Sequence, residues 1–139
     1  MELLSTLHVA TVFVSFGVIL LADKQAFAWL RGTQKTLDPK RLHAYHLMTW
    51  ACLATLIISG FFLFLPRASY LLSEPLFIMK MLFVGILVTN AVLIGRLMHV
   101  ATVRPFRDLA DKEVIPLLAS GAFSMLGWIG AVVVAVSIF

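Results

Sequence analysis

The chain has 139 residues, of which 61% are hydrophobic, and a formal net charge of +4. A soluble fold of this length cannot bury so much apolar surface, so we expect one membrane domain, residues 1–139, with the excess facing lipid. The single cysteine, Cys52, excludes an internal disulfide and a cysteine-based zinc site. The sequence carries no P-loop, GxSxG or GxGxxG motif, and nothing in it indicates nucleic-acid binding.

Four apolar stretches are long enough to cross a bilayer, which takes roughly 20 helical residues. The first is predicted at about residues 3–22, with Asp23 at its polar end. The helix can continue beyond Asp23 as far as Gly32, a typical C-terminal stop. Because Glu2 rather than a basic residue precedes this stretch, we expect a retained helix and not a signal peptide.

The second span is predicted at about residues 46–65. Asp38 is a typical N-cap and Pro39 is favoured at the first helical position, so the helix should begin with a polar turn ahead of the span. Pro66 is expected to end it.

The third span is predicted at about residues 76–99, after the helix-start pattern Ser73-Glu74-Pro75. The polar segment 102–113 should form a short interfacial turn or helix, and the fourth span should cover about residues 114–139. Four spans with short links predict an all-α membrane protein, an up-down-up-down bundle. No carboxylate is expected well inside any span, which argues against a carboxylate relay.

Small residues recur every three or four positions along the fourth span. They are Ser120, Ser124, Gly127, Ala131 and Ala135. Such a stripe favours a face for close helix packing, and the alternative is room for a flat cofactor.

Basic residues predict the orientation in the membrane. Those in or beside the first and third links are Lys24, Arg31, Lys35, Lys40, Arg41, Arg96, Arg104, Arg107 and Lys112. The second link contributes only Arg67, with Lys80 a few residues inside the third span. Since short cytoplasmic loops are rich in lysine and arginine, both termini are expected outside the cytoplasm.

An outer candidate site follows from Lys80, because a lysine at a helix centre costs roughly 2.5–3.5 kcal/mol. His8 lies near the start of the first span, which runs in the same direction as the third, so His8 and Lys80 should be level. The alternatives are a histidine hydrogen-bonded to a neighbouring helix and a lysine that reaches the head groups.

An inner candidate site comprises His46 at the start of the second span and His99 at the end of the third, with His43 one turn before His46. Neutral imidazole is the commonest metal ligand, and two on facing helices can hold a haem iron from both sides. The alternative is a set of ordinary interfacial histidines.

Three short motifs resemble a family of bacterial membrane proteins. They are Leu7-His8 followed by Gly17, the segment Arg41 to His46 with the later Ser59 to Leu63, and Phe77 to Leu82. The pattern resembles the broad HemJ-, CopD- and SirB-like group over the first three spans. The resemblance implies a bacterial inner membrane, binding of haem b, and functional roles for His8 and Lys80.

We therefore expect haem b, or a related porphyrin, within the bundle, serving electron transfer or porphyrin oxidation. His8 is the expected iron ligand, and Lys80 is expected as second ligand, propionate partner or proton donor; His46 and His99 are further cofactor-binding candidates. The open alternatives are a non-enzymatic membrane protein that packs against a partner and a small oligomeric transporter or metal-handling protein. The expected contacts are the lipid bilayer, and a redox partner or a second copy of the chain.

Overall fold

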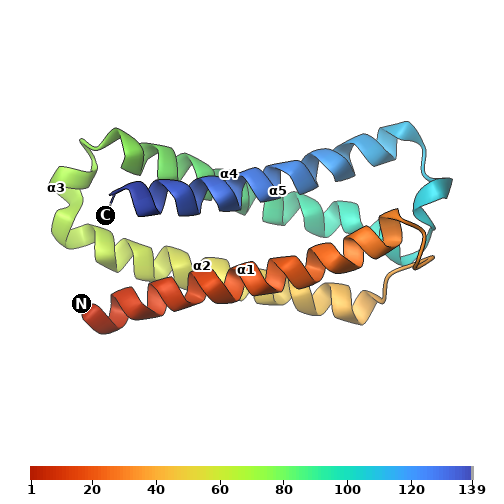
Figure 1. Ribbon diagram of the computed structural model, residues 1–139, viewed down its shortest axis with the longest axis horizontal. Helices are drawn as coiled ribbons and strands as arrows, with labels where there is room; N and C mark the ends of the chain where they lie inside the picture. The colour runs from red at the N-terminus through yellow and green to blue at the C-terminus, as the bar shows by residue number, and fades with distance from the viewer. Residues whose placement is uncertain (139) are drawn as a thin grey trace.

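The computed structural model describes residues 1–138, which form helices joined by short turns and contain no strand (Figure 1). Four helices in this part of the chain are long and apolar enough to cross a membrane. They are α1 (Glu2–Leu30), α2 (Pro39–Phe64), α4 (Pro75–Leu97) and α5 (Asp111–Ile138). Consecutive long helices run in opposite directions, so residue 1 and the end of α5 lie at the same end of the bundle (Figure 1). This confirms the all-α, multi-pass architecture.

Short helical elements connect the long ones. The link between α2 and α4 contains η1 (Leu65–Arg67) and α3 (Ala68–Leu71), and the link between α4 and α5 contains η2 (Met98–Thr102) and η3 (Phe106–Asp108). Pro66 therefore ends the α-helical hydrogen bonding of α2 at Phe64, but short helical turns continue to Leu71.

The helix ends follow local capping chemistry. Asp38 caps α2 as expected, because its Oδ1 accepts a hydrogen bond from the Lys40 backbone N–H at 3.0 Å. Gly32 follows α1 with a φ of 76°, a left-handed conformation that favours glycine. Glu74 precedes α4 without a side-chain cap.

The fourth long helix begins at Asp111, ahead of the apolar stretch. Glu113 Oε2 accepts a hydrogen bond from the Ala110 backbone N–H at 3.0 Å, and Glu113 also pairs with Arg104. The reach of the Glu113 carboxylate back to the backbone stabilises the first turn before lipid-facing residues begin.

Two antiparallel hairpins make up the bundle. The N-terminal hairpin pairs α1 with α2, the C-terminal hairpin pairs α4 with α5, and contacts between the hairpins are much sparser (Figure 1). A Cβ built on Gly127 would lie 2.7 Å from Leu87 Cδ2, so a side chain there would hold α5 away from α4. Ser120 and Ala131 also pack toward α4, which confirms the packing role of these members of the small-residue stripe.

The hairpins meet in two apolar clusters. A central cluster contains Leu53 of α2, Leu87 and Ala91 of α4, and Trp128 of α5. An end cluster at the first and third links contains Trp29, Leu37, Ala101 and Leu117.

Replacement of Gly130 by alanine tests the close packing of the C-terminal hairpin. A Cβ at this position would lie 2.5 Å from Phe83 Cε1, so Gly130→Ala should destabilise the protein by about 1–3 kcal/mol. Gly121→Ala is the control on the same helix, since nothing lies within 4 Å of its Cβ and alanine gains up to about 1 kcal/mol of helix propensity. Free energies of unfolding are measured by dodecyl sulfate titration followed by circular dichroism. Equal stability of the two variants would contradict the packing described here.

Candidate functional site

His8 forms a hydrogen-bonded pair with the neighbouring helix near the end of the bundle that holds the N-terminus. Its Nδ1 lies 2.7 Å from Ser59 Oγ of α2. The Ser59 hydroxyl donates its proton to the Thr55 carbonyl oxygen at 2.6 Å, so it accepts from His8 Nδ1–H. The tautomer that follows leaves the lone pair on His8 Nε2.

Small residues allow this approach of α1 to α2. A Cβ on Gly60 would lie 3.3 Å from His8 Cε1, so the absence of a side chain there makes room for the imidazole. The ring is half-buried.

Lys80 is half-buried on α4 and lies within coulombic range of His8. Within residues 1–138, no carboxylate forms a salt bridge with it. The His8 region therefore combines an imidazole with a free Nε2 and a nearby unpaired ammonium group.

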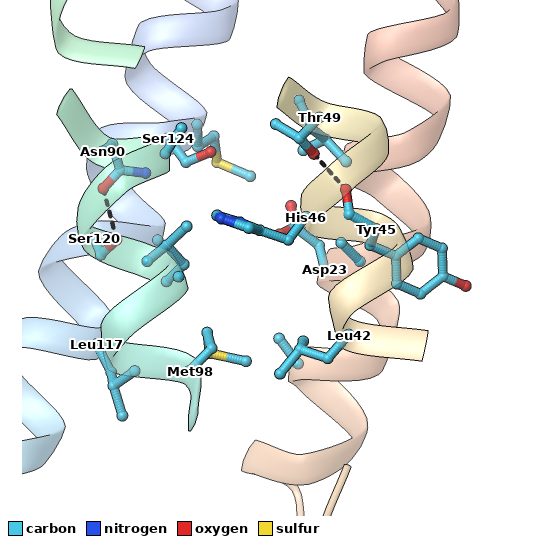
Figure 2. A pocket seen from close by; sticks show the side chains of 18 of the residues that line it. Asp23, Leu42, Tyr45, His46, Thr49, Asn90, Met98, Leu117, Ser120 and Ser124 are labelled. Atoms are coloured by element: carbon cyan, nitrogen blue, oxygen red, sulfur yellow. Dashed lines mark hydrogen bonds between the residues drawn. The ribbon is translucent and has the colours of Figure 1, made fainter. Parts of the chain in front are cut away.

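A cavity of about 600 Å³ lies between the two hairpins, toward the opposite end of the bundle (Figure 2). Trp128 and Leu53 line it near the central cluster, and Met98 and Leu117 line it near the end cluster. The volume falls within the roughly 300–1,000 Å³ typical of small-molecule sites. We call this space the inter-hairpin cavity.

Asn90 places a buried side-chain amide on the wall of this cavity. Its side chain is 7% exposed, and its Oδ1 accepts a hydrogen bond from Ser120 Oγ at 2.6 Å. With the oxygen turned to α5, the amide nitrogen points into the cavity (Figure 2).

His46 extends from α2 into the inter-hairpin cavity (Figure 2). Its Nε2 accepts a hydrogen bond from Trp50 Nε1 at 3.1 Å, which places the ring proton on Nδ1. The ring passes against α4 at Gly95, where a Cβ would lie 2.7 Å from His46 Cε1.

The structure brings the inner histidines to one cavity and keeps them apart from the outer pair. His43, His46 and His99 all line the inter-hairpin cavity, whereas His8 and Lys80 do not. His43 and His99 are exposed. Among residues 1–138, no group of three or more His, Cys, Asp or Glu side chains is arranged to hold a metal ion.

Two cavity residues are missing from the sequence-based candidates. Asp23 was expected at the polar end of the first span, in a helix that continues toward Gly32. The helix α1 does continue to Leu30, and Asp23 is a half-buried carboxylate on the cavity wall, a position that the sequence did not indicate. Asn90 carried a usable signal, because a polar amide within an apolar stretch is a functional candidate by default.

Comparison with known proteins finds no family model, no curated protein and no solved structure that matches the chain. The resemblance to the HemJ-, CopD- and SirB-like group therefore stays a prediction. Any assignment of function depends on the side chains described above.

Gly95→Ala tests the placement of His46. The added methyl group overlaps the imidazole, so we expect His46 to move and the Trp50 indole N–H to lose its acceptor. The measurement is the ¹⁵N-labelled indole N–H resonance of Trp50, assigned with Trp50→Phe. Gly85→Ala is the control on the same helix, because nothing lies within 4 Å of its Cβ. An unshifted Trp50 resonance in Gly95→Ala would refute the contact.

Proposed function

We propose that this chain is a haem-binding protein of the bacterial inner membrane that takes part in electron transfer or porphyrin oxidation. The observation that carries the proposal is the hydrogen bond from His8 Nδ1 to Ser59 Oγ, which leaves Nε2 as a free donor atom for a metal. Histidine ligands in proteins typically donate their other ring N–H in this way, which fixes the ring and raises its basicity.

The outer residues fit haem b in their chemistry. His8 would hold the iron through Nε2, with Ser59 orienting the ring from α2. Lys80 would pair with a propionate, since its ammonium has no salt-bridge partner within the described residues. The bound group would supply one-electron chemistry, and a redox partner or a second copy of the chain would exchange electrons with it.

The inner histidines fit an iron less well. His46 Nε2 is engaged by the Trp50 indole, and the proton on Nδ1 leaves that nitrogen without a lone pair for a metal. His99 and His43 are exposed beside it. We therefore assign the iron to His8 and not to the inner group.

The orientation that accompanies this proposal has both termini outside the cytoplasm. The basic residues of the first and third links then face the cytoplasm, and His8 and Lys80 lie in the outer leaflet. The bundle contacts lipid directly through the exposed apolar side chains of all four long helices.

A reporter fusion tests this orientation. A reporter that is active only in the cytoplasm, fused after Phe139, should be silent, because the end of α5 faces outward. The same reporter inserted after Thr33, in the first link, should be active. Activity in the first fusion and silence in the second would reverse the orientation.

A visible spectrum of the purified, haem-supplied protein tests the function. We expect a Soret band that shifts on reduction by dithionite, and we expect this band to be lost in His8→Ala. In Ser59→Ala the haem affinity should fall about 10–100-fold, because the His8 ring loses its hydrogen-bond partner. Lys80→Met should weaken haem retention less than His8→Ala. His43→Ala is the control, since that histidine is exposed at the other end of the bundle.

Two outcomes would contradict the haem assignment. An unchanged haem spectrum in His8→Ala would eliminate His8 as the required ligand. Absence of any Soret band despite adequate haem supply would favour a non-enzymatic membrane protein that packs against a partner.

A further inference from the structure

The inter-hairpin cavity opens sideways to the lipid. Phe27 of α1 and Met125 of α5 line it, and these side chains are 49% and 56% exposed. On the opposite side, α2 and α4 close the cavity, because His46 contacts α4 at Gly95. The helices α1 and α5, which contact each other much less than α2 and α4 do, form the less tightly closed side of the cavity.

Two hydrogen-bond donors face this cavity from opposite hairpins. Asn90 of α4 directs its amide nitrogen into the cavity (Figure 2). His46 of α2 also lines the cavity, and it carries its proton on Nδ1 because its Nε2 accepts from Trp50. Within residues 1–138, no protein atom accepts a hydrogen bond from either group. Asn90 is only 7% exposed, so an acceptor on a molecule bound in the cavity would pair with an amide donor that has no protein partner among the described residues.

An acceptor completes the polar part of the cavity. Asp23 of α1 is half-buried and lines the same cavity, and it forms no salt bridge among the described residues. The remaining wall is largely apolar, with Leu53, Leu87 and Trp128 at its inner end. A matching ligand has an apolar body and oxygen atoms that can both accept and donate hydrogen bonds.

We propose that the inter-hairpin cavity binds the head group of a lipophilic quinone or quinol. Carbonyl oxygens of a quinone would accept from the Asn90 amide and from His46 Nδ1–H, and a quinol hydroxyl would donate to the Asp23 carboxylate. A plain hydrocarbon chain of a lipid offers no acceptor to Asn90, so it satisfies the cavity less well. The site is separate from His8 and does not depend on haem.

The probe is decylubiquinone, and its dissociation constant is measured by equilibrium binding to the full chain in lipid nanodiscs. We expect saturable binding that weakens about tenfold in Asn90→Leu, which keeps the size of the side chain but removes the donor. Thr89→Val is the matched control. Thr89 directly precedes Asn90, its side chain is exposed, and its hydroxyl donates to the Gly85 carbonyl oxygen of its own helix. Decylbenzene, with the same tail and no oxygen, should bind more weakly and be insensitive to Asn90→Leu.

A second pair of variants tests the site if Asn90→Leu fails to fold. Ala22→Phe fills the cavity from α1 and should abolish quinone binding, whereas Ala54→Phe, on the exposed face of α2, should not. Circular dichroism checks that each protein keeps its helical content. Equal binding of decylbenzene and decylubiquinone, no saturable binding of either probe, or unchanged binding in Ala22→Phe would overturn the proposal.

The His8→Ala variant separates this site from the proposed haem site. Quinone binding that is unchanged in His8→Ala supports an independent site, whether or not haem is bound. Loss of quinone binding in that variant would overturn the separation.

Discussion

Trp29 joins the two hairpins at one end of the bundle, and the position of the cavity depends on this junction. The side chain is 1% exposed, and its indole N–H donates to the Arg104 carbonyl oxygen at 2.9 Å. Beside it, the Leu37 backbone N–H donates to the Ala101 carbonyl oxygen at 2.8 Å. These bonds satisfy backbone groups in two links that leave helical geometry close to the membrane, where an unpaired carbonyl is costly. They also fix the distance between the hairpins.

The two hairpins contact each other at the Trp29 junction and at the central cluster. Between these two contacts they are not packed tightly, and the cavity lies there. Close packing occurs within each hairpin, where small residues let backbones approach, as at Gly127 against Leu87 and at Gly60 against His8. Among the glycines of residues 1–138, Gly95 makes such an approach between hairpins, where it meets His46. Unequal packing of this kind is how a four-helix bundle can be stable and still enclose about 600 Å³.

Neighbouring side chains give the two deepest histidines opposite chemistry. The Ser59 hydroxyl donates its proton to a backbone carbonyl oxygen and therefore accepts from His8 Nδ1–H, so His8 keeps a lone pair on Nε2. Trp50 can only donate, so His46 must accept on Nε2 and carries its proton on Nδ1. One imidazole is thereby suited to bind a metal, and the other is suited to donate to a carbonyl oxygen. The residue type alone does not distinguish them.

Apolar run length, end signals and the small-residue stripe were sufficient to predict four membrane helices, the cap at Asp38 and the packing face of α5, because these features depend on local sequence and on the bilayer thickness. The cavity between the two hairpins could not be predicted from the sequence, since it depends on side chains far apart in the chain that meet at Trp29 and Trp128. Asp23 shows the same limit: its place near the end of an apolar run, in a helix that continues toward Gly32, was predicted, but only the packing of the two hairpins puts it on a cavity wall. The tautomer of His8 was decided by tertiary structure for a similar reason, because it follows from the contact of the ring with Ser59 on another helix, whereas the Trp50 partner of His46 lies one turn away on the same helix.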